Sequence, residues 1–284
     1  VFLFRGETMI KLAVFDLDET LLTPDKQVTD RTIKAINLLR STGVKVTIAT
    51  GRAYELMKPF ASILSINEPM IVNNGAVVKD PSSLENLYEK TVDQPSLLKM
   101  MNYAKTHEDT FALFTENGFY GPESERLDYY RRFNKTYPEA NIPIVIEDDI
   151  KKLSLLKTYK LFVVIKDEAR FKTAYKDMKA DLDAHVTQSM TGFLDILPKG
   201  ANKGEALKFL MNHYGYSKDE VIVFGDNDND SEMLALIPFS FAMKNATIKA
   251  KNSANYITLD TNDQDGVAKT IEKLDQIIID KKVK

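Results

Sequence analysis

Residues 11–20 read KLAVFDLDET, an apolar run that ends in Asp16, Asp18 and Glu19. The run from Lys11 to Phe15 predicts a strand buried inside a parallel sheet, because such strands are apolar on both faces. The two aspartates then stand at the carboxyl end of that strand, where open α/β sheets bind their ligands. We therefore expect a doubly wound parallel-sheet (Rossmann-like) α/β core whose site begins at these carboxylates.

The next segments repeat this design. Thr29 can cap a helix with apolar residues at helical spacing, Gly43 ends it, and residues 44–49 form a second strand. This is one βαβ unit. A third strand is expected at Met70–Val72, and Asn74-Gly75 predicts a hairpin turn into a further strand at 76–78.

The character of the chain changes between about residues 81 and 191. Segments rich in Tyr, Phe and Lys, with strand candidates at 111–114 and 160–165, lack the acidic strand ends. The βα pattern then resumes with a helix at 203–214, a strand at 221–224, a helix opening near Asp230 and a last helix at about 264–279. We expect residues 9–81 and 195–284 to form the core, and residues 82–194 to form an inserted α+β cap domain.

Composition limits the possible functions. A chain of 284 residues suits two domains, and a net charge of −3 gives no electrostatic footprint for nucleic acid. No stretch approaches the length of a membrane span, and zero cysteines exclude disulfides and thiolate chemistry. We expect a cytoplasmic protein without nucleic-acid or membrane partners; the oligomeric state stays open. Residues 1–8, before Met9, are too few for a signal peptide and are left out of the fold prediction.

A second acidic turn, Gly225 to Asp230 (GDNDND), follows the strand at 221–224. An isolated Asp-x-Asp is most often a polar turn, but two acidic turns on neighbouring strands could share one cation. An EF-hand loop starting at Asp226 is a rival interpretation. It fails because its sixth position is Ser231 instead of Gly and its twelfth is Ile237 instead of Glu.

Groups suited to phosphate accompany these turns. Thr50-Gly51-Arg52 ends the second strand with a hydroxyl, a residue whose backbone N–H an anion can approach closely, and a guanidinium. Lys203 adds a charge at the start of its helix, beside free backbone amides. Alone, each is more often a turn or a solvated side chain. Together with two acidic strand ends, they favour a phosphate site.

The ordered set Asp16-x-Asp18-x-Thr20, Thr50-Gly51-Arg52, Lys203 and Gly225-Asp226-x-x-Asn229-Asp230 resembles the four motifs of the haloacid dehalogenase superfamily of phosphohydrolases. The place of the insertion, Asn74-Gly75-Ala76 and residues 195–200 (DILPKG) resemble the Cof-type branch with a type IIB cap. Asp195 departs slightly from that pattern, since relatives often carry Glu there.

The resemblance implies a role for each motif residue. Asp16 would be the nucleophile, and Asp18 the general acid and base. Magnesium would be bound by Asp16, the backbone carbonyl of Asp18 and Asp226. The groups expected to hold phosphate are Thr50, Lys203, Asn229 and the backbone N–H groups of Leu17 and Gly51, while Thr20 and Asp230 would support the site. Arg52 and Asn74 could contact the rest of the substrate or simply cap turns.

These roles imply a magnesium-dependent hydrolase of small phosphorylated metabolites, with sugar phosphates expected, that acts through an aspartyl-phosphate intermediate. A phosphosugar mutase of the same superfamily is the enzyme alternative. A non-enzymatic phosphoacceptor module also groups Asp, Thr and Lys around magnesium. Such a module is far shorter, and its acidic pair precedes the acceptor, so the chain fits it poorly.

Overall fold

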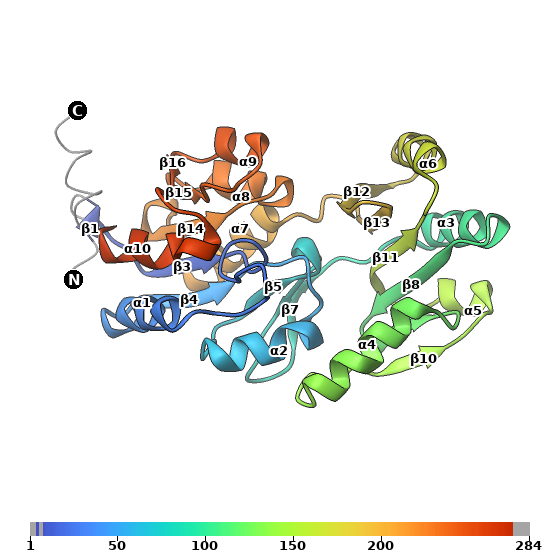
Figure 1. Ribbon diagram of the computed structural model, residues 1–284, viewed down its shortest axis with the longest axis horizontal. Coiled ribbons are helices and arrows are strands. Elements are labelled where there is room, and N and C mark those ends of the chain that lie inside the picture. Colours follow the sequence, from blue (N-terminus) through green and yellow to red (C-terminus); the bar gives the residue numbers. More distant parts are fainter. Residues whose placement is uncertain (1–3, 6–7, 275–284) are drawn as a thin grey trace. The chain divides into compact units, whose positions relative to one another are not determined.

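The computed structural model describes residues 4–5 and 8–274, and the chain divides into two compact units. The first unit, the core, consists of residues 1–52, 60–88 and 202–284. The second unit, the cap, consists of residues 53–59 and 89–201. Figure 1 colours both units along the sequence, and the core collects segments from the two ends of the chain.

A five-stranded parallel sheet forms the centre of the core, in the order β16-β15-β14-β3-β4. The expected doubly wound α/β core is thereby confirmed. The first strand in sequence, β3, lies between β4 and the central strand β14, so the chain leaves β3 toward one edge and returns on the other side. The strands are β3 (Leu12–Phe15), β4 (Lys45–Ile48), β14 (Val221–Gly225), β15 (Phe239–Ala242) and β16 (Tyr256–Ile257).

Helices cover both faces of this sheet. The β3–β4 and β14–β15 connections run toward opposite edges, so right-handed crossovers place α1 and α8 on opposite faces. In agreement, α1 packs with α10, whereas α8 packs with α7 (Figure 1). The helices of the core are α1 (Asp30–Ser41), α7 (Lys203–Tyr214), α8 (Ser231–Leu236), α9 (Ile248–Ser253) and α10 (Gly266–Glu272).

Aromatic rings stack across the core sheet from strand to strand. The ring centroids of Phe15 and Phe224 lie 5.1 Å apart, those of Phe224 and Phe241 4.9 Å, and those of Phe241 and Tyr256 4.9 Å. The three phenylalanines are buried. Burying a side chain of this size stabilises a fold by roughly 1.5–3 kcal/mol, so these rings help to hold neighbouring strands together.

A small three-stranded sheet, in the order β5-β6-β7, completes the core, with β5 and β6 antiparallel; a bridge between Ala49, directly after β4, and Ile71 of β5 joins it to the main sheet. The expected hairpin is confirmed, but its connection contains four residues, because Val72 pairs with Val77. The remaining short elements are β1 (Phe4–Arg5), β2 (Thr8–Met9), β5 (Met70–Val72), η1 (Asn73–Gly75), β6 (Val77–Lys79), β7 (Asn86–Glu89), η2 (Lys218–Glu220), η3 (Asp228–Asp230) and η4 (Asn262–Gln264).

The cap is built on a mixed six-stranded sheet in the order β10-β9-β8-β11-β13-β12. One apolar cluster joins this sheet to α3, α5 and α6, and a second joins it to α4, with Ala53 and Leu56 in the latter. The elements are α3 (Gln94–Thr106), β8 (Thr110–Thr115), β9 (Gly118–Gly121), α4 (Glu125–Thr136), β10 (Ile144–Ile146), α5 (Ile150–Ser154), β11 (Thr158–Val164), α6 (Glu168–Asp181), β12 (Ala184–Met190) and β13 (Phe193–Pro198).

The expected domain boundaries need correction. The boundary at 194/195 is too early, because β13 pairs with β11 and β12 in the cap sheet. The boundary at 81/82 is also too early, because β7 extends the hairpin sheet of the core. Helix α2 (Tyr54–Ile63) contributes residues to both units. The last helix ends at Glu272, and the part predicted for residues 275–279 lies outside the described residues.

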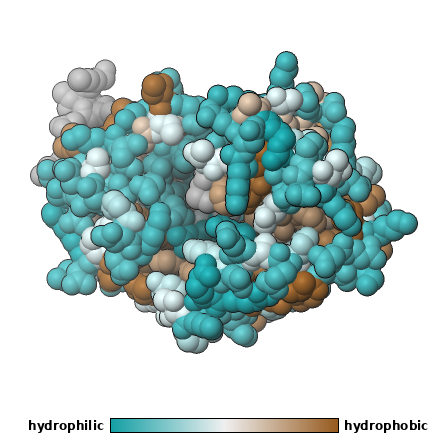
Figure 2. Space-filling model, turned by 45° about the vertical axis from the view of Figure 1, so that its right-hand side comes forward, coloured by the Kyte–Doolittle hydropathy of each residue, from teal (hydrophilic) through white to brown (hydrophobic). Residues whose placement is uncertain are grey.

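Hydrophilic residues cover most of the face seen in Figure 2, and apolar residues appear there as separate patches. Dispersed apolar residues are normal on a water-exposed surface. Within residues 4–5 and 8–274, no helix combines the length and apolar character needed to cross a membrane.

Candidate active site

The carboxyl ends of two neighbouring strands bring the acidic turns together. Phe15 of β3 lies opposite Phe224 of β14, and the Asp16 N–H donates to the Phe224 carbonyl at 2.9 Å. Asp16 and Asp226 therefore leave the sheet at the same edge. The Thr20 hydroxyl donates to Asp226 Oδ1 at 2.7 Å, which ties the loop after β3 to the turn after β14.

Three buried carboxylates form one cluster. Asp16, Asp226 and Asp230 each offer an oxygen, and these oxygens lie within 4.8 Å of one another. The fully buried Lys203 ammonium donates to Asp16 Oδ1 at 2.5 Å and to Asp230 Oδ1 at 2.6 Å. One ammonium among three carboxylates leaves negative charge in a buried place, which favours a bound cation.

The proton affinities in this cluster agree with that charge balance. Burial raises the pKa of Asp16 well above its usual value, against the effect of Lys203. Burial and the neighbouring Asp230 raise the pKa of Asp226 to about 7. Burial alone would lower the pKa of Lys203, but the two carboxylates it contacts outweigh burial and raise it. The single ammonium of Lys203 therefore does not neutralise the three carboxylates. A set of ligands made only of oxygen atoms fits Mg²⁺.

Asp230 shapes the turn after β14. Its Oδ2 accepts hydrogen bonds from the backbone N–H groups of Asp226 and Asn227, both at 2.9 Å, while Oδ1 binds Lys203. A Cβ at Gly225 would lie 2.6 Å from Asp230 Cβ and Cγ, so a side chain at that position would displace Asp230. Both Asp230 oxygens therefore hold the turn and the ammonium in place.

Asp18 lies in different surroundings. Arg52 donates through Nε to Asp18 Oδ2 and through Nη2 to Oδ1, both at 2.8 Å, and Lys26 Nζ lies 3.1 Å from Oδ1. Burial acts to raise the pKa of Asp18, but these two cations outweigh it and lower the pKa. The Arg52 guanidinium also lies 4.7 Å from the ring centre of Phe60. The pKa of Asp18 is therefore lowered, whereas that of Asp16 is raised.

The Thr50 loop meets the hairpin turn and η3. Thr50 is buried, its Oγ1 accepts from the Arg52 N–H at 3.2 Å, and its carbonyl accepts from the Asn74 N–H at 3.0 Å. Asn229 Nδ2 donates to Asn74 Oδ1 at 2.8 Å. The end of β4, the hairpin turn and the turn after β14 are thereby joined by hydrogen bonds.

The core thus gathers the residues that sequence analysis singled out into one hydrogen-bonded assembly at the carboxyl ends of β3, β4 and β14. Arg52 and Asn74 find partners inside this assembly, namely Asp18 and Asn229. Sequence analysis missed Lys26, which contacts Asp18 and Glu19. No pattern indicated it, because it lies in a turn with φ +58° and belongs to none of the motifs.

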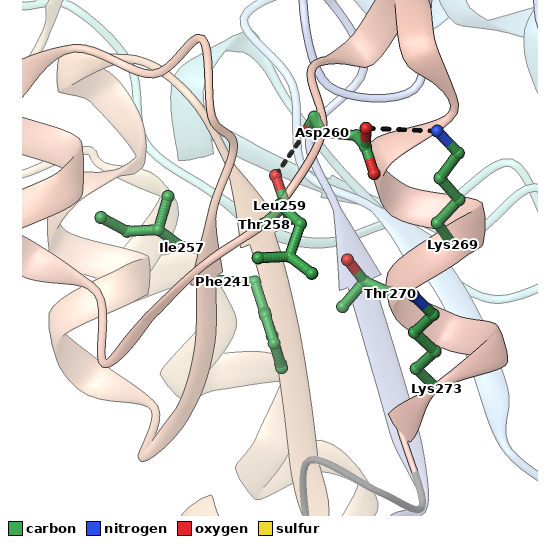
Figure 3. Close-up of a pocket in the computed structure, with 8 residues that line it drawn as sticks. All are labelled: Phe241, Ile257, Thr258, Leu259, Asp260, Lys269, Thr270 and Lys273. Carbon is green, nitrogen blue, oxygen red and sulfur yellow. Dashed lines mark hydrogen bonds and ion pairs between the residues drawn. The ribbon is translucent and has the colours of Figure 1, made fainter.

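A small cavity of about 40 Å³ lies elsewhere in the core, beside α10 at the β16 edge of the sheet (Figure 3). An ion pair between Lys269 and Asp260 and a hydrogen bond from Thr258 to the Asp260 carbonyl border it. It is far smaller than a metabolite site and shares no residue with the acidic cluster. Its lining residues are Phe241, Ile257, Thr258, Leu259, Asp260, Lys269, Thr270 and Lys273.

Comparison with known proteins identifies the family. The family model that describes haloacid dehalogenase-like hydrolases matches residues 13–271, which is nearly the whole chain. The chain belongs to this family. A Mycoplasma genitalium protein that is named, provisionally, as a phosphatase is 27% identical over 270 residues, covering 91% of this chain and 96% of its own length. The expected class, a phosphatase of the haloacid dehalogenase type, is thereby confirmed.

Solved structures share the fold of this hydrolase. A haloacid dehalogenase-like hydrolase from Bacteroides thetaiotaomicron has a TM-score of 0.81 at 26% identity, with 93% of this chain and 99% of that chain covered. A structure titled as a subclass IIB sugar phosphatase has a TM-score of 0.77 at 21% identity, again with 93% and 99% covered, and shows the fold alone. The resemblance to the Cof-type branch with a type IIB cap is confirmed at the level of fold.

Proposed function

We propose that this phosphatase is magnesium-dependent, hydrolyses small phosphomonoesters and forms an aspartyl phosphate on Asp16. The observation that carries the proposal is the buried cluster of Asp16, Asp226 and Asp230 around Lys203, at the ends of adjacent strands. Such a site neutralises and positions charge, which is the main requirement of phosphoryl transfer.

In the proposed first step, an Asp16 carboxylate oxygen attacks phosphorus, the bond to the ester oxygen breaks, and Asp18 gives that oxygen its proton. In the second step, water attacks phosphorus and gives its proton to Asp18. The acyl-phosphate bond then breaks, releasing inorganic phosphate and restoring the Asp16 carboxylate. The ion pairs with Arg52 and Lys26 lower the pKa of Asp18, so Asp18 must leave them and take up a proton before it can act as the donor in the first step.

Magnesium would be held by Asp16, the backbone carbonyl of Asp18 and Asp226. When bound, it supplies positive charge to the phosphate oxygens. Asp230 is assigned a supporting role because both of its oxygens already accept hydrogen bonds from Lys203 and from backbone N–H groups. Thr20, bonded to Asp226, supports the same site.

Thr50, Lys203 and Asn229, with the backbone N–H groups of Leu17 and Gly51, are proposed to bind the phosphate oxygens. These groups recognise what all phosphomonoesters share, so they leave the rest of the substrate unspecified. We propose that the substrate is a small phosphorylated metabolite, and that sugar phosphates are the preferred class. Location in the cytoplasm stays a prediction.

A phosphosugar mutase remains the second candidate, because the two-step chemistry differs only in what accepts the phosphoryl group from the aspartate. A mutase transfers it to a sugar hydroxyl and needs a bisphosphate activator. Water as acceptor gives inorganic phosphate in an amount equal to the substrate consumed.

The test is a phosphate-release screen over a panel of phosphorylated metabolites, with magnesium or with excess EDTA. We expect magnesium-dependent release of one phosphate per substrate molecule, without any bisphosphate. Isomerised sugar phosphate with little free phosphate would favour the mutase. Full turnover in EDTA would contradict the proposed metal.

A further inference from the structure

The turn of the hairpin between β5 and β6 has an unusual backbone. Three consecutive residues, Asn73, Asn74 and Gly75, have positive φ angles of 50°, 55° and 87°. Such angles are cheap for glycine and tolerable for asparagine, but costly for most other residues. Backbone strain of this kind persists only where the surrounding structure holds it, and it gathers at functional sites.

The surroundings of this turn belong to the proposed phosphate site. The Asn74 N–H donates to the Thr50 carbonyl at 3.0 Å. A Cβ on Gly51 would lie 2.8 Å from Asn74 Oδ1, so the Asn74 amide packs directly against the Gly51 backbone. The same Oδ1 accepts the hydrogen bond from Asn229 Nδ2 at 2.8 Å. Asn74 therefore links two phosphate-binding segments that are far apart in the sequence.

The Asn229 side chain needs such a partner. A primary amide has two N–H donors and one acceptor, and its orientation is set by the group that engages one of them. With one N–H bonded to Asn74, the amide nitrogen is fixed beside the Thr50-Gly51 loop. Within the described part of the chain, this is the one hydrogen bond that the Asn229 amide nitrogen donates, which leaves its second N–H for a ligand. Asn74 itself is 6% exposed, and its Oδ1 is already used by Asn229.

We infer that Asn74 is a positioning residue, which holds the Asn229 amide so that its second N–H is donated to the substrate phosphate. The inference rests on the proposed function, since it concerns the same phosphate site. It assigns Asn74 a role in binding the phosphate rather than the rest of the substrate.

The alternative explanation is that Asn74 serves only the backbone, as an asparagine suited to a positive φ. Asn74→Gly separates the two explanations. Glycine adopts this φ more readily than asparagine, so the turn should keep its shape while the amide is lost. Asn73→Gly makes the same change at the preceding residue of the turn, with a similar φ, and serves as the matched control.

The experiment measures binding of inorganic phosphate to the full chain with magnesium, by titration calorimetry, and kcat and KM for p-nitrophenyl phosphate. A net hydrogen bond is worth about 0.5–1.5 kcal/mol, so Asn74→Gly should weaken phosphate binding by roughly 2- to 12-fold. Asn73→Gly should change it by less than about 2-fold. Thermal unfolding of each variant verifies that the fold persists.

The double variant Asn74→Gly/Asn229→Ala decides the mechanism. If Asn74 acts through Asn229, the double variant should bind phosphate no more weakly than Asn229→Ala alone, because coupled residues are not additive. Three results would each overturn the inference: losses of phosphate affinity that add up in the double variant, unchanged affinity in Asn74→Gly, or an equal loss of affinity in Asn73→Gly. A wild-type chain that binds phosphate without turnover would overturn the proposed function alone, and one that neither binds nor releases phosphate would overturn both.

Discussion

Asp16 and Asp18 are chemically identical side chains two residues apart, and the structure gives them opposite environments. Asp16 is buried among carboxylates and bonded to Lys203, whereas Asp18 is paired with Arg52 and Lys26. These environments raise the pKa of Asp16 and lower that of Asp18, so binding of magnesium and substrate must change both protonation states before Asp16 can attack and Asp18 can donate a proton. A nucleophile and a proton donor should therefore respond differently to the same substitution.

Asp16→Asn should abolish turnover for every substrate, because it removes the nucleophile. Asp18→Asn removes proton transfer, which contributes about 10²–10⁴-fold and matters most when the leaving oxygen is strongly basic. With p-nitrophenyl phosphate, the intermediate should still form but hydrolyse slowly. Intact-mass spectrometry of acid-quenched Asp18→Asn protein should show one added phosphoryl group, mapped to Asp16. An adduct on another residue, or turnover by Asp16→Asn, would refute the covalent mechanism.

The pKa of Asp226, raised to about 7, makes the metal-free protein sensitive to pH. Between about pH 4, where an ordinary Asp titrates, and pH 7, the folded chain holds a proton that the unfolded chain has lost. The contribution of this group to stability therefore falls as pH rises through that window. In EDTA, the drop in Tm from pH 5 to pH 8 should be smaller for Asp226→Asn than for the wild type. An equal drop would show that Asp226 titrates normally.

Magnesium should oppose the loss of stability at high pH, because Asp226 must lose its proton before it binds the ion. The rise in Tm that saturating magnesium produces should be larger at pH 8 than at pH 5 in the wild type. It should be weak at both values in Asp226→Asn. A magnesium shift that is independent of pH, or unchanged in the variant, would exclude Asp226 as a ligand.

At the scale of elements, the placement of α7 depends on the hairpin turn. A Cβ on Gly75 would lie 2.2 Å from the carbonyl oxygen of Asn202, the N-cap residue directly before Lys203. Gly215, at the other end of α7, also has a positive φ but has nothing within 4 Å of such a Cβ. The two glycines share backbone strain and differ in the steric contact.

Gly215→Ala should cost about 1–2 kcal/mol of stability through backbone strain and leave phosphatase activity intact. Gly75→Ala should cost a further 1–3 kcal/mol or so by overpacking, and it should reduce activity because it displaces the helix start that carries Lys203. Urea unfolding and phosphate release measure the two effects. Equal stability losses, with activity kept in both variants, would show that the turn does not position α7.

Some elements could be predicted from sequence because local signals agree with the fold. Helix α7 begins and ends at the predicted residues, Lys203 and Tyr214, since an Asn N-cap and a Gly after the last turn mark both ends. The convergence of the acidic turns followed from parallel strands ending at one edge. The pairing of Arg52 and Lys26 with Asp18 could not be predicted, because it depends on how the loop after β3 folds back on itself and against the loop after β4. The boundary at 194/195 failed because β13 is apolar, like a core strand, and only its pairing assigns it to the cap.

At the scale of the whole molecule, the core residues proposed to bind phosphate do not distinguish one phosphomonoester from another, so substrate selection must have another source. We predict that the cap supplies it. Replacing residues 89–201 by a short linker between Tyr88 and Asn202 should leave a weak phosphatase with little preference among substrates. Comparing kcat/KM over the metabolite panel, before and after the deletion, tests this. A folded core that keeps the parental ranking of substrates would contradict the prediction.

The complete burial of Lys203 also has a consequence for chemical reactivity. Amine-selective acylating reagents require an accessible, neutral amine, and Lys203 is 0% exposed and held in its charged form by two carboxylates. Peptide mapping after brief acylation at neutral pH should find exposed lysines such as Lys172 labelled and Lys203 untouched. Labelling at Lys203 would then appear only as the core opens. The rate of its acylation, followed against denaturant, would report how often the catalytic centre exposes itself to solvent.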